Sequence, residues 1–227
     1  MGLCAISLAL MLAAPAADAK RKPDRMPGAR TANPSALVAM EMAFARMAQE
    51  KGQWTAFRQY ADDDAVMFVP QPVRAKDWLK GRANPAQAVK WQPYQVWMSC
   101  DGTLGVTRGA WQRPDGSVGY FTTAWRKQES RSKLGEYLWE MDQGDVLPTP
   151  LPQSEFLDAS VADCSPPAPP EDLPLPAGVE RRSGWSKDKT LHWTADVRAD
   201  GSRTITLQRW TGQAYAEVFR SDVAAGG

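Results

Sequence analysis

Histidine is almost missing from this chain of 227 residues, whose single imidazole belongs to His192. One histidine cannot build a His-rich zinc site, and no Ser-His-Asp or Cys-His arrangement is recognisable around it. A large net charge is also absent. The formal net charge is +1, which excludes the strong positive field of a nucleic-acid-binding protein. No Gly-rich phosphate loop is present either. We therefore expect no metal, no cofactor, no nucleic-acid partner and no catalytic residue that a motif alone would reveal.

Long apolar runs are also scarce, and the one at the N-terminus is too short to span a bilayer comfortably. It ends in Ala17-Asp18-Ala19 before Lys20, the A-x-A pattern of a secretory signal. We expect residues 1–19 to be a signal peptide, residues 20–33 to be a disordered leader, and the protein to be periplasmic or secreted. No later stretch is expected to span a membrane.

Cysteine is the next scarcity, with three in the chain. Removal of the signal peptide would leave Cys100 and Cys164, and an even pair in an oxidising compartment suggests a disulfide. Two free thiols are an equally weighted alternative, because the sequence does not give the distance between their Cα atoms.

Tryptophan is abundant by contrast, with ten residues against six phenylalanines and five tyrosines. The stretch GYFTTAWRKQ, residues 119–128, places large side chains at every second position. This alternation is typical of a strand with one apolar face. Further strands are predicted from residue 89 to residue 147, and Asp-Gly pairs at 101–102 and 115–116 predict hairpin turns between them.

Helices are predicted before these strands. The first helix is predicted over residues 34–51. Asn33 can cap its N-terminus, Gly52 can end it, and apolar residues recur along one face. A second short helix should stop near Ala61, so that the three acids of residues 62–64 fall in a turn rather than at a helix C-terminus. No metal-ligand spacing surrounds those acids.

The C-terminal third has a different composition. Residues 148–178 are rich in proline and are expected to form a linker, and residues 179–222 are expected to form a three-stranded β meander that leans on the main domain. The predicted fold class is α+β, with N-terminal helices packed on a curved antiparallel sheet and the meander appended.

The order of elements from residue 34 to residue 147, with YADDDAVMFVPQP, GYFTTAWRKQ and YLWEMDQGD in succession, resembles the nuclear transport factor 2-like superfamily. It is most similar to its SnoaL-like and ketosteroid-isomerase-like exported bacterial members. The resemblance implies a cone with an internal hydrophobic pocket and a homodimer formed through the outer sheet face. Ketosteroid isomerases carry a general-base aspartate directly before the proline that ends the first strand. Here Val69 precedes Pro70, so that isomerisation is not expected and the protein is taken to be non-catalytic.

Alternation and the resemblance together suggest which side chains point inward. Phe121, Thr123 and Trp125 are expected to point inward, and Trp111, Phe121 and Trp125 to face helix 34–51. Tyr120, Thr122 and Ala124 are expected to face helices, solvent or a partner. The predicted pocket residues are Phe44, Phe68, Trp97, Arg108, Trp111, Phe121, Trp125, Trp139 and Asp142. An open pocket and a core filled by these aromatic rings are equally weighted alternatives.

Three functions remain open at this point. The first is a pocket that binds a small apolar or aromatic ligand without catalysis. The second is an interaction module that uses the sheet face and the C-terminal strands. The third is an enzyme of the SnoaL-like type with a different catalytic group, for which Asp142 with a tyrosine is the candidate.

Overall fold

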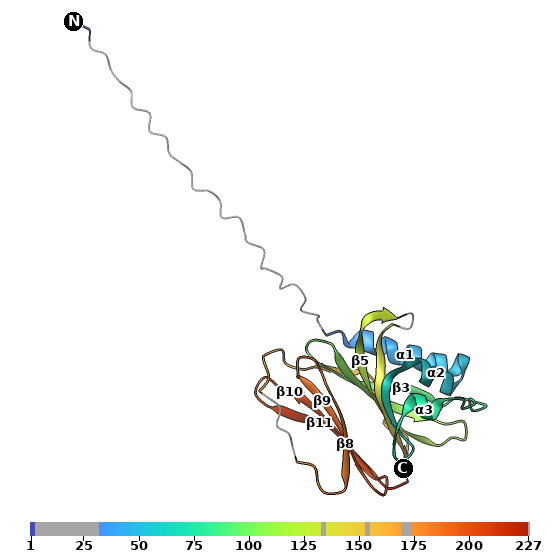
Figure 1. Ribbon diagram of the computed structural model, residues 1–227. Helices are drawn as coiled ribbons and strands as arrows, with labels where there is room; N and C mark the ends of the chain where they lie inside the picture. Colours follow the sequence, from blue (N-terminus) through green and yellow to red (C-terminus); the bar gives the residue numbers. More distant parts are fainter. Residues whose placement is uncertain (3–31, 133–134, 153–154, 169–173, 227) are drawn as a thin grey trace.

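The computed structural model describes residues 1–2, 32–132, 135–152, 155–168 and 174–226 (Figure 1). The predicted signal peptide and nearly all of the predicted leader lie outside these residues. The helices are α1 (Pro34–Lys51), α2 (Gln53–Tyr60) and α3 (Ala75–Leu79). The strands are β1 (Ala61–Phe68), β2 (Pro72–Arg74), β3 (Lys90–Met98), β4 (Leu104–Gln112), β5 (Val118–Ser132), β6 (Gly135–Leu147), β7 (Asp158–Val161), β8 (Val179–Trp185), β9 (Leu191–Arg198), β10 (Arg203–Trp210) and β11 (Tyr215–Val223).

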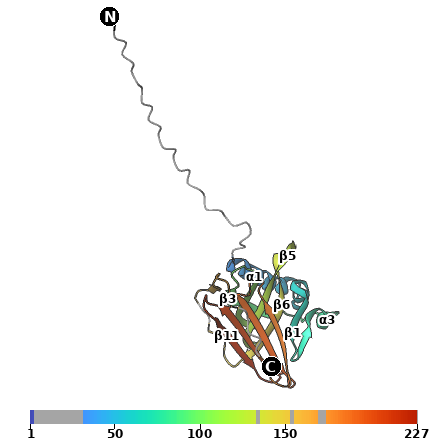
Figure 2. The ribbon, with the colours of Figure 1, turned by 60° about the vertical axis from the view of Figure 1, so that its left-hand side comes forward.

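The predicted α+β class is confirmed at this level. A seven-stranded sheet has the order β2-β1-β6-β5-β4-β3-β7, and a four-stranded sheet has the order β11-β10-β9-β8. The helices lie on one face of the larger sheet, while the smaller sheet covers the opposite face (Figures 1 and 2). The larger sheet therefore has a helix side and a sheet side, and each side has its own core.

Helix α1 begins and ends where its sequence indicates. The Asn33 side chain accepts a hydrogen bond from the Ala36 N–H at 3.3 Å, and Pro34 occupies the first helical position. Leu37 and Phe44 lie on its buried stripe and pack into the helix-side core. This stripe positions α1 across the strands that carry the aromatic side chains.

The larger sheet is mixed rather than antiparallel, which corrects the sequence prediction. Strands β3 to β6 pair antiparallel as expected, but β1 runs parallel to β6 and β7 runs parallel to β3. Strand β7 also lies within the segment predicted to be a linker. Its four residues add to the free edge of β3, because an unpaired edge offers backbone donors and acceptors to any extended segment nearby.

The three acids after α2 lie within β1 and not in a turn. The pairing of β1 with β6 shifts register between Ala61 and Val66, so the acidic residues bulge away from the partner strand. Asp64 pairs with Arg74 at 3.3 Å, and Asp63 pairs with Lys76. A bulge with nearby cations holds these acids in an extended segment.

The C-terminal sheet has four strands instead of the predicted three. The missed strand is β8, whose sequence VERRSGW lacks an apolar alternation. Its pairing with β9 is supported by a bidentate bond from Arg181 to Asp196, with nitrogen–oxygen distances of 2.6 and 2.7 Å. An ion pair between β8 and β9 therefore stabilises a strand whose own sequence lacks apolar alternation.

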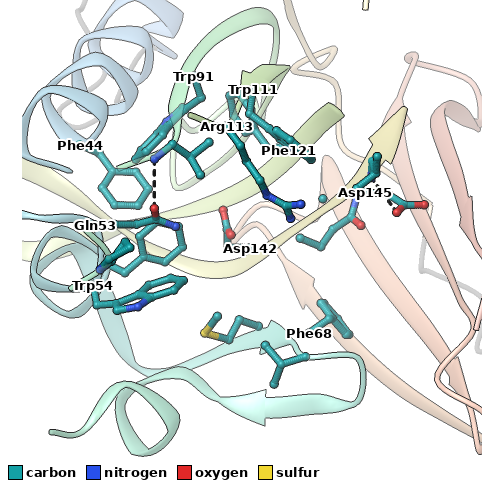
Figure 3. A pocket seen from close by; sticks show the side chains of 18 of the residues that line it. Phe44, Gln53, Trp54, Phe68, Trp91, Trp111, Arg113, Phe121, Asp142 and Asp145 are labelled. Carbon is teal, nitrogen blue, oxygen red and sulfur yellow. Dashed lines mark hydrogen bonds between the residues drawn. The ribbon is translucent and has the colours of Figure 1, made fainter. Parts of the chain in front are cut away.

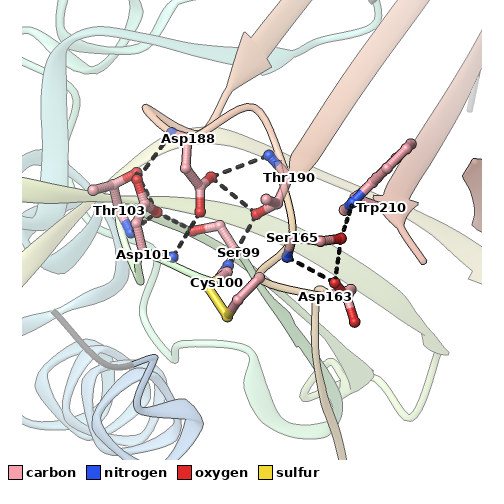
Figure 4. The surroundings of a disulfide bond; sticks show 10 residues. Ser99, Cys100, Asp101, Thr103, Asp163, Ser165, Asp188, Thr190 and Trp210 are labelled. Carbon is pink, nitrogen blue, oxygen red and sulfur yellow. Dashed lines mark hydrogen bonds between the residues drawn. A yellow bond between two sulfur atoms is a disulfide. The ribbon is translucent and has the colours of Figure 1, made fainter. Parts of the chain in front are cut away.

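The two sheets meet at a pair of turns that share one sequence pattern. Residues 99–104 read SCDGTL in the β3–β4 turn, and residues 186–191 read SKDKTL in the β8–β9 turn. In each turn the aspartate accepts bonds from the backbone and the hydroxyl of the threonine two positions later. The turns also bind each other, since the Asp101 N–H donates to Asp188 Oδ2 at 2.7 Å and the Asp188 N–H donates to Asp101 Oδ2 at 3.0 Å (Figure 4).

A second sequence pattern is shared by the next turn of each sheet, the β4–β5 turn and the β9–β10 turn. Residues 113–117 read RPDGS, residues 198–202 read RADGS, and both are closed by an arginine N–H that donates to the serine carbonyl at 2.9 Å. The β3–β5 hairpins and the β8–β10 hairpins are thus built on similar turns. The sequence prediction did not include this repetition.

Candidate functional site

A cavity of about 500 Å³ lies between the helices and the helix side of the larger sheet (Figure 3). Its volume is within the range of small-molecule sites. Eight aromatic side chains of the described residues line it. They are Phe44, Trp54, Phe57, Phe68, Trp78, Trp91, Trp111 and Phe121. An open space is therefore present beside a packed core, and each of the two alternatives holds for part of the predicted aromatic set.

Strand alternation puts the sheet's contribution on one face. Phe121 lines the cavity, the Thr123 hydroxyl points to Asp142, and Trp125 packs against Phe44 with ring centroids 5.9 Å apart. On the outward side, the Tyr120 hydroxyl meets Ser221 of the smaller sheet. The predicted inward face of β5 is therefore confirmed, because alternate residues of a strand point to opposite sides. The other face meets the chain's own smaller sheet and not helices, solvent or a partner.

Asp142 is one of two carboxylic acids that the described residues place in the cavity wall, together with Asp145. It lies on β6, and its Oδ2 atom accepts a hydrogen bond from Thr123 Oγ1 at 2.8 Å. Burial raises the pKa of Asp142 to about 7; the Thr123 bond opposes this rise, and the nearby Glu41 adds to it. A carboxyl group with such a pKa exchanges its proton near neutral pH.

Glu41 is a buried acid beside the cavity wall that sequence reasoning missed. It is fully buried on α1, where its carboxyl accepts from Trp91 Nε1 at 2.7 Å, Thr107 Oγ1 at 2.6 Å and Trp125 Nε1 at 3.1 Å. Burial raises the pKa of Glu41, and these three hydrogen bonds oppose the rise. The available signal was its position four residues after Leu37, on the apolar stripe, where a charged side chain needs buried partners.

Five of the nine predicted pocket residues line the cavity: Phe44, Phe68, Trp111, Phe121 and Asp142. Trp125 and Trp139 lie on the same side but are fully buried in the helix-side core rather than in the cavity wall. They support the wall residues from behind. Ligand binding by any of these residues stays a prediction.

The prediction that Trp97 and Arg108 line the pocket is wrong, because both side chains point to the sheet side. Trp97 packs against Phe219 with ring centroids 5.8 Å apart, and the Arg108 guanidinium lies between the rings of Phe219 and Tyr120. Arg108 is an even number of residues from Val106, which belongs to the sheet-side core, so it shares that orientation. The sequence prediction placed them by residue type alone.

The short helices contribute lining residues that were also missed. Trp54 and Phe57 come from α2, and Trp78 comes from α3. Trp54 meets Trp78 edge to face, with ring centroids 5.4 Å apart. The available signal was the presence of tryptophans on helices of only eight and five residues. So short a helix has little core of its own for a tryptophan to fill.

The position that the resemblance assigns to an isomerase base does face the cavity. Val69 lines it, and an isopropyl group cannot accept a proton. Among the described residues that line the cavity, none is a tyrosine or a histidine, so the predicted pairing of Asp142 with a tyrosine is not found there. His192 lies in the smaller sheet, stacked 3.7 Å from the Trp185 ring, and burial lowers the pKa of His192 to about 4.

Within the described part of the chain, no three His, Cys, Asp or Glu side chains are grouped in a way that could hold a metal ion. None of the helices in that part is long and apolar enough to cross a bilayer.

The predicted disulfide is present. Cys100 and Cys164 are bonded, with their Cα atoms 5.2 Å apart (Figure 4). By contrast, the face through which the resemblance implies a homodimer is covered by the chain's own smaller sheet. Leu191, Ile205 and Leu207 of that sheet pack on Val106 and Ala124 of the larger one.

No protein-family model matches this chain, and no curated protein matches it in sequence. Solved structures with a similar shape include a nuclear transport factor 2-like protein of unknown function from Shewanella baltica, at 14% identity, 51% coverage of this chain, 94% coverage of that chain and a TM-score of 0.37. A conserved protein from Planctomyces limnophilus is 15% identical. The match covers 52% of this chain and 96% of that chain, with a TM-score of 0.35. The CaMKII hub of S. rosetta is 16% identical. The match covers 51% of this chain and 98% of that chain, with a TM-score of 0.38. With TM-scores this low, function has to be argued from the cavity itself.

Proposed function

We propose that this protein binds a small apolar or aromatic molecule in the cavity between its helices and its larger sheet. The observation that carries the proposal is the cavity of about 500 Å³, walled by aromatic rings from α1, α2, α3 and four strands. Rings held edge to face, as Phe44 is against Trp91 at 4.9 Å, form a rigid apolar wall. Burial of an apolar ligand against such a wall contributes about 25 cal/mol per Å².

The test uses a neutral naphthylamine dye whose emission rises in apolar surroundings. We expect saturable binding to the wild-type protein. Val146 is exposed and lines the cavity, so Val146→Trp should fill the entrance and weaken binding about tenfold or more. Val161→Trp is the matched control, because Val161 is an exposed strand valine outside the cavity and should leave binding unchanged. Absence of saturable binding, or equal affinities in both variants, would overturn the proposal.

A second candidate is favoured by the position of Asp142, a carboxylic acid in the cavity wall whose pKa burial raises to about 7. A carboxyl group that titrates near neutral pH is suited to move a proton to and from a ligand carbon. In this case Asp142 acts as the single acid–base group. Deuterium from heavy water should then enter the carbon next to the carbonyl of an aromatic ketone, and Asp142→Asn should abolish the exchange. Exchange at the rate of the buffer alone would dismiss this candidate.

We also propose that the protein is exported and that residues 34–147 are a nuclear transport factor 2-like cone. The Cys100–Cys164 disulfide supports an oxidising compartment. The succession of α1, α2, β1, α3 and strands β3 to β6 around a cavity supports the cone. Mass spectrometry of the protein from its native host should find Lys20 as the first residue. An intact Met1 would overturn the export proposal.

A further inference from the structure

The Asp142 carboxyl has no cationic partner within the part of the chain that the structure describes. Its hydrogen bond comes from the neutral Thr123 hydroxyl, and the ion pairs of the described residues do not include it. Asp142 is half-buried, and its Oδ1 atom accepts no hydrogen bond from the described residues. Carboxyl oxygens away from bulk water are normally hydrogen-bonded, so this oxygen is open to a donor or a positive charge on a ligand.

A second carboxyl group lies directly behind the wall. Glu41 accepts the indole N–H of Trp91, a wall residue, at 2.7 Å, and the indole N–H of Trp125 at 3.1 Å. An acceptor at the indole N–H increases the electron density of the ring, which strengthens the attraction of its face for a positive charge. The acid behind the wall therefore makes the cavity more favourable for a cation.

Two rings of the wall already carry cations. The Arg113 guanidinium lies 4.6 Å from the Trp111 ring centroid, and the Arg82 guanidinium lies 3.5 Å from that of Trp78. Apart from Asp142, the charged lining groups among the described residues are Asp145 on β6 and the exposed Arg113 in the turn after β4. Helices α2 and α3 contribute uncharged side chains to the lining. The lining thus combines two carboxyl groups with one guanidinium group, so its charges are acidic in balance.

We propose that the ligand of this cavity is an organic cation, an amine or a quaternary ammonium group on an apolar or aromatic body, whose charge lies against Asp142 and the neighbouring rings. This rests on the proposed binding function and adds the ligand's charge to it. The aromatic walls take the apolar body, and Asp142 supplies the counter-charge. Because the cation favours the ionised carboxyl, binding releases a proton from Asp142 near neutral pH.

The test compares two probes of the same shape by calorimetry on the full chain. Phenyltrimethylammonium is the cation, and tert-butylbenzene is its neutral carbon isostere. We expect the cation to bind about tenfold or more tightly than the isostere, with an affinity that rises from about pH 6 to about pH 8. Titrations in buffers of different ionisation enthalpy should reveal the released proton.

Two variants locate the charge. Asp142→Asn should weaken binding of the cation about tenfold or more, leave the isostere unchanged and abolish proton release. Asp145→Asn should weaken binding of the cation less than Asp142→Asn does, because Asp145 Oδ1 already accepts the Val146 N–H at 2.7 Å. Equal affinity for the two probes would overturn the charge preference while the apolar binding function stands. Binding of neither probe would overturn both, and a loss in Asp145→Asn equal to that in Asp142→Asn would overturn the position of the charge.

Discussion

The carboxyl group of Asp142 is held in its protonated form by its surroundings up to nearly neutral pH. Its pKa is about 7 in the folded protein, against about 3.9 for an aspartate in an unfolded chain. Between these two values the folded state binds more protons than the unfolded state. The free energy of unfolding contributed by Asp142 therefore decreases as pH rises from about 4 to about 7.

Asp142→Asn should remove this dependence. We expect the variant to match the wild type near pH 4 and to exceed its free energy of unfolding by about 1–3 kcal/mol above pH 7, because the amide has no charge to bury. Urea unfolding at a series of pH values measures the difference. His192 titrates over an overlapping range with the opposite sign, since its lowered pKa makes stability rise with pH, but it is common to both proteins and cancels. A difference that does not vary with pH would contradict the prediction.

At the scale of elements, the repeated turns differ at one backbone position. Gly102 in the β3–β4 turn has φ of 66°, and the equivalent residue of the β8–β9 turn is Lys189, with φ of 63°. This left-handed conformation costs a residue with a side chain about 1–2 kcal/mol, whereas glycine adopts it freely. The second turn therefore retains a local cost that the first turn avoids.

Lys189→Gly should raise the free energy of unfolding by about 0.5–1 kcal/mol through release of this cost. The lysine side chain also lies over Trp185, 5.6 Å from its ring centroid, so Lys189→Ala is the matched control: it loses the side chain but keeps the backbone cost. Chemical denaturation should place the glycine variant above the alanine variant. In the first turn, Gly102→Ala should lower stability by about 1–2 kcal/mol. A glycine variant no more stable than the alanine variant would show that φ at this site is not strained.

At the scale of the whole molecule, the segment around Cys164 joins the two sheets. The disulfide binds it to Cys100 in the turn after β3, on the larger sheet. On the smaller sheet, Trp210 donates its indole N–H to Ser165 Oγ at 3.0 Å and accepts the Asp163 N–H at its carbonyl at 3.1 Å. Together with β7, these contacts hold part of the predicted linker against both sheets.

Replacement of both Cys100 and Cys164 by serine should lower the free energy of unfolding by about 4 kcal/mol, since the bond closes a loop of 64 residues in the unfolded chain. Guanidinium unfolding measures the loss. Wild-type protein treated with a reducing agent should approach the double variant, and the double variant should not respond to the reducing agent. Thiol titration of unreduced mature protein should find no free thiol. Two reactive thiols with unchanged stability would contradict the bond.

Local patterns in the sequence determined the elements that depend on near neighbours. The cap at Asn33, the stop at Gly52, the Asp-Gly hairpin turns and the inward face of β5 could all be predicted, because capping, turn geometry and strand alternation act over a few residues. The α+β class and the cysteine pairing also followed from patterns and counts, although free thiols remained an alternative.

Only the tertiary structure decided what each face meets. Glu41 was not singled out from the sequence, and it is three donors from distant strands that surround its carboxyl group. Trp97 and Arg108 had the residue types of a pocket, yet the smaller sheet folds back over their side. Strand β8 is defined by its partner β9 rather than by its own pattern. These outcomes depend on contacts between residues far apart in the chain, whose geometry is fixed when the sheets and helices pack together.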